Sequence, residues 1–240
     1  TANVNYNHKS SDNLPISGYS AQSPMYALVW GYNNNPIKAW KDEYFQGRYN
    51  AENYNNTDGT HGNSLVYPAN DSYNPYRTAY EEINTLDRNR IYGNAQVNIK
   101  ILNGLTLNLR SAIDITNDWR TQRKPWYTPN YQAGFYREQS TRSYILNHDF
   151  LLQYKNNWFE DRFGLTAAFG GNSLERKYRR TDITLNKLQM DGVYNITNLP
   201  SGEIPDIYAN KTKKIVNSFY GYAEMSWDGT YYLDLTARND

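Results

Sequence analysis

The feature that most constrains the fold is a pair of strictly alternating segments, separated by a three-residue break, within residues 91–115. In 91–101 the odd positions are apolar or small and the even positions are polar or amphipathic, and in 105–115 the odd positions are mostly Leu and Ile. Side chains of a β-strand alternate between the two faces of a sheet, so each segment predicts a strand with one apolar and one polar face. The Asn-Gly step in the break predicts a tight antiparallel hairpin.

The pattern recurs downstream in two more hairpins, and a first strand is expected at the start of the chain. The expected strands are 1–7, 91–101, 105–115, 143–154, 162–172, 213–227 and 230 onward. Short breaks near 102–104, 156–161 and 228–230 alternate with long, polar, aromatic-rich connections at 8–90, 116–140 and 174–212.

Alternation of short and long connections between long strands is typical of outer-membrane β-barrels. We therefore predict an all-β fold, an antiparallel transmembrane β-barrel segment with short periplasmic turns and long extracellular loops. Trp158, Trp227 and Tyr231 flank short breaks, where an aromatic girdle at the membrane interface is expected. The polar face would line the lumen. Its expected members include Lys100, Arg110, Tyr220, Tyr222 and Glu224.

The competing fold is a soluble antiparallel sandwich, whose strands also alternate. The length of the strands, the polarity of their second face and the long loops favour the barrel. One residue opposes this prediction. His148 falls on the nominally lipid-facing side, where either a neutral imidazole or a local bulge would have to accommodate it. The sequence also leaves open whether residues 23–30 or 77–86 form a helical turn.

Composition excludes several classes of function. The mean hydropathy is −0.88, yet 24 of the 240 residues are Tyr, a content that does not fit simple disorder. The net charge of +1 gives no general preference for nucleic acid, and the basic run at 175–180 is interpreted as a solvated rim at the start of a long loop, facing anionic lipopolysaccharide.

Catalytic and metal-binding motifs are not found in the sequence. There is no Cys, and the three His residues are scattered, so we expect no metal and no cofactor. Asp114 and Asp149 fall on polar strand faces, where a water-filled lumen explains them without catalysis. We expect no catalytic residues and no enzyme activity.

The expected loop at 117–136 is the strongest candidate for substrate binding. Its aromatic residues alternate with Asn, Gln, Arg and Thr, a mixture that stacks on sugars or contacts peptide while forming hydrogen bonds. The candidates are Trp119, Trp126, Tyr127, Tyr131 and Phe135. Packing against other loops or against a protein partner is the alternative use of these residues.

Several segments resemble the barrel of the SusC/RagA-like TonB-dependent transporters of Bacteroidetes. They are "NPY" at 74–76, the hairpin at 84–114, the final hairpin at 217–240 and "GYSAQSPMYALVWG" at 18–31. The resemblance implies that residues 1–240 are part of a plugged barrel of about 22 strands in the cell outer membrane, with the plug and the remaining strands outside this sequence.

The resemblance also implies partners and cargo. They are a SusD-like surface lipoprotein, TonB acting through the missing N-terminal part, outer-membrane lipid, and a glycan or oligopeptide substrate taken up as a nutrient. A passive porin and a soluble glycan-binding β-domain remain alternatives.

Overall fold

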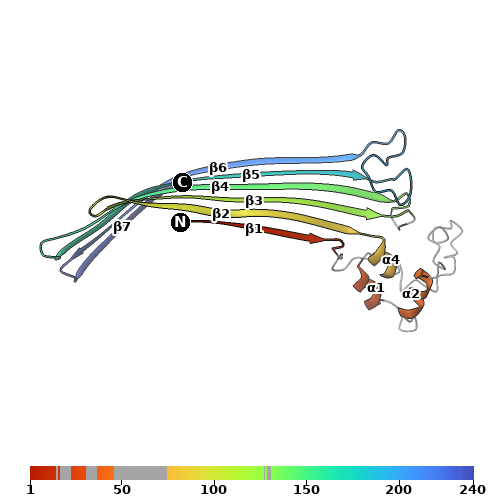
Figure 1. Ribbon diagram of the computed structural model, residues 1–240, viewed down its shortest axis with the longest axis horizontal. Helices are drawn as coiled ribbons and strands as arrows, with labels where there is room; N and C mark the ends of the chain where they lie inside the picture. The colour runs from red at the N-terminus through yellow and green to blue at the C-terminus, as the bar shows by residue number, and fades with distance from the viewer. Residues whose placement is uncertain (15, 17–22, 31–36, 46–74, 127, 129–130) are drawn as a thin grey trace.

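The protein forms one antiparallel sheet with a group of short helices at one end, as seen in a computed structural model (Figure 1). The structure describes residues 1–14, 16, 23–30, 37–45, 75–126, 128 and 131–240. The strands are β1 (Ala2–Ser11), β2 (Asn84–Leu102), β3 (Leu105–Lys124), β4 (Phe135–Trp158), β5 (Phe163–Leu185), β6 (Asp206–Trp227) and β7 (Tyr231–Asn239). The helices are α1 (Pro24–Trp30), α2 (Ile37–Phe45) and α4 (Pro75–Tyr80).

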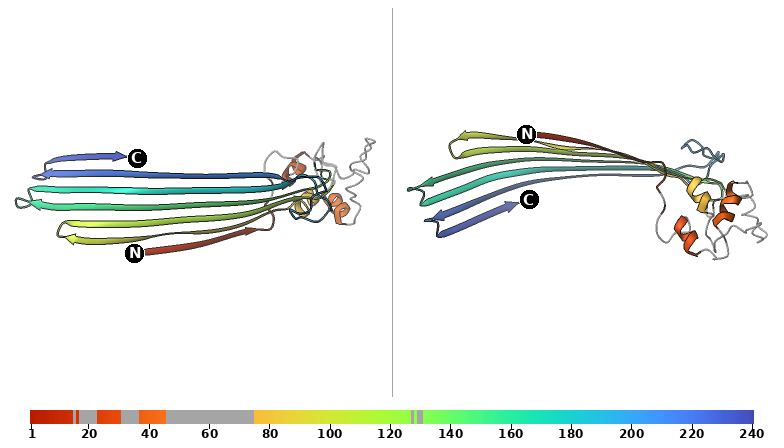
Figure 2. Two further views of the ribbon diagram at one scale, coloured as in Figure 1. Left: turned by 90° about the horizontal axis from the view of Figure 1, so that it is seen from above. Right: turned by 60° about the horizontal axis from the view of Figure 1, so that its bottom comes forward.

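Each strand pairs with the strands next to it in the sequence, in the order β1 to β7. The strands lie side by side in a single layer, with β1 and β7 at the two edges (Figure 2). The seven expected strands and their antiparallel order are confirmed. The first hairpin closes at Asn103 and Gly104, with a register shift between Lys100 and Leu102 and φ of 82° at Gly104.

The strands are much longer than expected, so the predicted limits of the long connections are wrong. β3 continues to Lys124 and β4 begins at Phe135, which leaves 125–134 in place of 116–140. The connection after β5 likewise covers 186–205 rather than 174–212. Outside the apolar band the side chains on both faces are largely polar, so the alternation that reveals a strand disappears while backbone pairing continues.

The basic run at 175–180 is therefore part of β5 and does not begin a loop. Its side chains alternate between the two faces of the sheet, because β5 stays in continuous register with β4 through this segment. His148 also keeps its place without a bulge. It pairs with Ser111 on one side and Ser173 on the other, so it lies in a polar row on the otherwise apolar face.

The register gives the sheet two chemically different faces. The apolar face carries odd positions of β2, β3, β5, β6 and β7 and even positions of β1 and β4, and the polar face carries the others. Val97 and Phe219 on the apolar face are 54% and 53% exposed. Within the described part of the chain no second sheet covers this face, so the sandwich alternative does not describe this structure.

Aromatic rings cluster where the tight turns lie. Trp158, Phe163 and Trp227 occupy one row of the apolar face, with ring centroids 5.7 Å apart for the first pair and 6.1 Å for the second. Phe159 in the neighbouring turn lies 6.4 Å from Trp227. The expected aromatic row at this end of the sheet is confirmed in position.

The helices lie at the opposite end, next to the long connections (Figure 1). Of the two segments that the sequence left open, 23–30 contains α1, whereas 77–86 contains the end of α4 and the start of β2. α4 contacts α1 and α2. Tyr44 and Phe45 of α2 pack against Tyr80, with centroids 5.9 and 5.4 Å away. None of the helices in the described residues is long and apolar enough to cross a membrane.

Candidate functional site: the charged polar face

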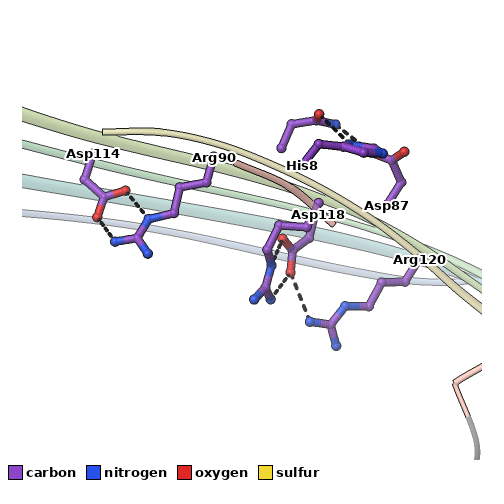
Figure 3. Close-up of polar contacts among 8 residues, drawn as sticks. His8, Asp87, Arg90, Asp114, Asp118 and Arg120 are labelled. Atoms are coloured by element: carbon purple, nitrogen blue, oxygen red, sulfur yellow. Dashed lines mark hydrogen bonds and ion pairs between the residues drawn. The ribbon is translucent and has the colours of Figure 1, made fainter. Parts of the chain in front are cut away.

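An arginine and aspartate cluster lies on the polar face near the ends of the long strands. Arg88 of β2 is directly opposite Asp118 of β3 and donates two hydrogen bonds to its carboxylate, at 2.6 and 2.7 Å. Arg120 donates to the same carboxylate at 3.0 Å. Figure 3 shows Asp118 and Arg120 on the same side of the sheet as the Arg90 and Asp114 pair, with His8 and Asp87 on the other side.

A second carboxylate, Asp182 of β5, joins two more arginines on this face. It accepts from Arg180 at 2.6 Å and from Arg137 of the neighbouring strand. The Asp182 carboxylate is almost fully buried between the two guanidinium groups, whose side chains remain about one-third exposed. Two arginines therefore share each of the two aspartates.

Arg120, Arg137 and Arg180 line one hollow of about 430 Å³ together with Gln122 and Gln139. Leu14 and Ile16 from the segment after β1 border it. Counting Arg88 as well, four guanidinium groups face two carboxylates, which leaves an excess of two positive charges. Guanidinium groups bind carboxylates in a bidentate manner, so this hollow is suited to a ligand with a carboxylate and further polar groups.

A buried polar contact fixes α4 to the connection between β3 and β4. Arg77 is 1% exposed and donates to the Trp126 carbonyl at 2.8 Å and to the Thr128 hydroxyl at 3.3 Å. Glu82, just after α4, lies 3.5 Å from the Lys124 ammonium. Burial raises the pKa of Glu82, and the positive charges of Lys124 and Arg77 oppose that rise. Lys124 is two residues along β3 from Gln122, which lines the arginine hollow.

Four of the five predicted substrate-binding residues are described, and Trp119 lies apart from the other three. Trp119 lies within β3 on the apolar face, so the prediction that it belongs to a loop is wrong. Phe135 begins β4 and is buried, with the Tyr131 ring 5.0 Å away at a steep angle. Tyr131 in turn covers the Lys124 ammonium at 4.3 Å. Tyr127 lies outside the described residues. A role of these residues in substrate binding stays a prediction.

Trp126 belongs instead to a small apolar cluster on the connection between β5 and β6. It packs with Tyr194 and Leu199 against the buried Tyr136, Leu185 and Leu188. Its backbone N–H also donates to Asp191 at 2.9 Å. Burial raises the pKa of Tyr194 to about 12. This aromatic segment thus packs against another connection, as the alternative interpretation of the loop proposed.

The expected lumen residues share the polar face. Arg110 pairs with Asp149 at 2.9 Å, and the Tyr222 hydroxyl accepts from Gln153 at 2.9 Å. Sequence reasoning missed the cluster of Asp118 and Asp182. The available signal was an opposite charge two residues away on the same strand, as in Arg180 and Asp182, which places both side chains on one face.

Comparison with known proteins gives matches at the level of structure. No protein-family model and no curated protein sequence matches the chain. Solved structures of the RagAB peptide transporter do: one has a TM-score of 0.60 at 20% identity, covering 70% of this chain and 19% of that chain. The structure of the RagAB peptide importer in the closed-closed state matches with a TM-score of 0.61 at 21% sequence identity. The structure in the open-open state matches with a TM-score of 0.53 at 20% identity, and both have the same coverage as the first.

The sheet shares its fold with a segment of the RagAB peptide transporter, which agrees with the resemblance seen in the sequence. The chain spans 19% of the length of the RagAB chains that it matches.

Proposed function

We propose that this chain forms part of the barrel of a TonB-dependent importer in the outer membrane, acting with a SusD-like surface lipoprotein. One observation carries the proposal. A seven-stranded meander with an exposed apolar face and a charged polar face has the fold of a RagAB barrel segment. Such a sheet is stable in lipid only as part of a closed barrel, because backbone N–H and C=O groups left unpaired at an edge strand cost free energy in lipid. In the assembled transporter, β1 and β7 therefore pair with further strands.

The orientation follows from the two ends of the sheet. The tight turns with their aromatic row face the periplasm, and the long connections with α1, α2 and α4 face the outside. The polar face then lines the lumen. The lipoprotein covers the outer end, while TonB acts through a plug N-terminal to this sequence.

The arginine hollow indicates how cargo is held on its way through the lumen. Its excess positive charge near the outer end attracts a carboxylate, which an oligopeptide terminus or an acidic glycan provides. Neighbouring Gln122 and Gln139 add hydrogen-bonding groups for peptide or sugar. Binding of this kind is local and reversible, as transport requires.

The proposal is tested by uptake in cells that carry the full-length transporter with its lipoprotein. Labelled oligopeptides and acidic oligosaccharides are supplied with and without a proton uncoupler. We expect uptake of one of these classes, and its loss when the membrane is uncoupled. Uptake that persists without energy would identify a passive porin. Recovery of the protein without detergent would identify a soluble glycan-binding domain.

The hollow is tested separately with Arg137→Gln combined with Arg180→Gln. We expect uptake of carboxylate-bearing cargo to fall about tenfold or more, as for the loss of a charge-assisted contact. Arg110→Gln on the same face, farther from the hollow, is the matched control and should change uptake little. Equal effects of the two variants would exclude the hollow as a cargo site.

A further inference from the structure

A group of basic side chains lies on the apolar face, on the side of the sheet opposite the arginine hollow. Three of them, Arg142, Arg179 and Lys211, are directly opposite one another on β4, β5 and β6. The next row toward the tight turns holds Tyr144, Lys177 and Lys213. All five cations are exposed, and the six residues line a hollow of about 510 Å³.

This basic patch, defined by Arg142, Lys177, Arg179, Lys211 and Lys213, has little compensating negative charge. Glu175 accepts from Lys177 at 2.9 Å and from Lys213 at 3.1 Å. Among the residues that the structure describes, Arg142, Arg179 and Lys211 form no ion pair. Like charges directly opposite on adjacent strands repel each other. An anion bound between them would relieve that repulsion.

The distance of the patch from the aromatic row along the membrane normal indicates which anion it would meet. Lys213 is on the same face of β6 as Trp227 of the aromatic row, 14 residues away. At about 3.3 Å per residue and a tilt of about 40°, this separation corresponds to about 35 Å along the membrane normal. An apolar band of about 25 Å together with one headgroup layer fills that distance. The patch is thus at the depth of the outer headgroups.

We propose that the basic patch binds the phosphate of an outer-leaflet lipid headgroup. The inference rests on the proposed function, because it requires this face to contact lipid. The three side chains of Arg142, Arg179 and Lys211 surround the phosphate. Lys177 and Lys213 approach it from the membrane side, and the Tyr144 ring, 5.4 Å from the Lys177 ammonium, supports that side chain. The acyl chains lie along the apolar residues below.

The sheet provides a matched control at the same depth. Arg176 and Lys214 are directly opposite each other in the row between Lys177 and Glu175, but they point to the polar face. Neutralising this pair removes two positive charges at the same level of the barrel without touching the patch. If lipid binding depended only on the overall charge, both sets of substitutions would weaken it. If the patch is a lipid site, only the substitutions in the patch should weaken it.

The experiment uses full-length transporter in detergent, with and without Arg142→Gln, Arg179→Gln and Lys211→Gln combined. Binding of phosphorylated lipid A and of the same lipid after removal of its phosphates is measured by native mass spectrometry. We expect the triple variant to bind phosphorylated lipid roughly 100-fold more weakly, since each of the three surface cations contributes about 1 kcal/mol. The Arg176→Gln, Lys214→Gln control should change affinity less than threefold.

Three outcomes would overturn the proposal. They are equal losses in the two variants, equal binding of the dephosphorylated lipid, and competition by inorganic phosphate alone at the concentration at which the lipid binds. The folding control is the heat-dependent mobility of the barrel in gel electrophoresis. A folded outer-membrane barrel that fails the lipid test refutes the lipid site only, whereas a protein that never enters the membrane refutes the proposed function.

Discussion

The half of the sheet beside the tight turns and the half beside the long connections are stabilised in different ways. Near the turns, one face is covered with apolar and aromatic side chains such as Leu107, Phe169 and Trp227, and the hairpins close within two to four residues. Near the connections, charged side chains cover much of both faces, and buried ions such as Glu82 and Asp182 join neighbouring segments. The same backbone ladder runs through both halves.

The difference shows what each half requires from its surroundings. The turn half depends on an apolar medium against its exposed face, which an outer membrane supplies in the proposed function. The connection half carries charged side chains on both faces, and paired charges such as Glu82 with Lys124 determine how its segments meet. Removing a buried charge should therefore lower stability most in the connection half. Adding a charge to the apolar face should lower stability most in the turn half.

The largest effect is expected at the buried ion pair of the connection half. Lys124→Met leaves the Glu82 carboxylate buried without its partner, which should cost about 3 to 5 kcal/mol of local stability near pH 8. Burial raises the pKa of Glu82, so its folded carboxyl keeps a proton at a higher pH than the unfolded one. The loss should therefore be smallest below pH 4.5 and grow as the pH rises through the folded pKa.

Hydrogen exchange at the Arg123 amide measures this cost, because that N–H donates to the Ile83 carbonyl at 3.0 Å and reports opening between Glu82 and β3. Arg110→Met is the matched control, since its side chain is 54% exposed and its ion pair with Asp149 is worth about 1 kcal/mol or less. A Lys124→Met effect that is small or independent of pH would contradict the account of the buried pair.

The second effect tests the apolar medium of the turn half. Leu107 is between Ile99 and Leu152 on the apolar face, so under the proposed function Leu107→Arg should cost about 2 to 4 kcal/mol in the lipid-embedded protein. Asn108→Arg, one residue along on the polar face, should cost less than about 1 kcal/mol. Urea unfolding of the full-length protein in lipid vesicles measures both. Similar costs at the two positions would argue against a lipid-facing surface.

A smaller effect is expected at the tight turns. Gly104 has φ of 82°, and an added Cβ would lie 2.4 Å from the Lys155 carbonyl oxygen, so Gly104→Ala should cost about 2 kcal/mol or more. Gly229 has φ of 63° with nothing within 4 Å of an added Cβ, so Gly229→Ala should cost about 1 kcal/mol. The same unfolding measurement compares them, and a reversed order would contradict the close contact at Gly104.

The smallest effect is expected for an exposed ion pair between two turns. Arg162 donates to Asp228 at 3.0 and 3.2 Å, and both side chains are about half exposed. Arg162→Gln should lower stability by no more than about 1 kcal/mol, with the difference disappearing in high salt. A larger, salt-independent loss would show that this link between hairpins is structural.

Sequence reasoning succeeded where local patterns carry the information. The alternation in 91–115 identified β2, β3 and their turn, and the equivalent segments identified the other hairpins. It failed where the pattern changes. The limits of β3 and β4 were missed because Asn117, Arg123 and Glu138 place polar side chains on the apolar face as well, which removes the alternation without breaking the backbone ladder.

The candidate site was less predictable than the fold. The aromatic residues from Trp119 to Phe135 were grouped by their proximity in sequence, but Trp119 lies within β3, whereas Tyr131 and Phe135 pack together beyond the end of that strand. The arginine hollow escaped notice because its residues come from five separate segments. Arg137 and Asp182, for example, are 45 residues apart and meet only because β4 and β5 are neighbours.

The sequence by itself determined the alternation, the tight turns and the chemical difference between the two faces, because each depends on residues within one hairpin. Only the tertiary structure decided which charges meet. Arg77 reaches Thr128 across 51 positions, and Arg142, Arg179 and Lys211 form a single row across three strands. Cross-strand register sets such contacts, and a one-residue shift would move every side chain to the other face.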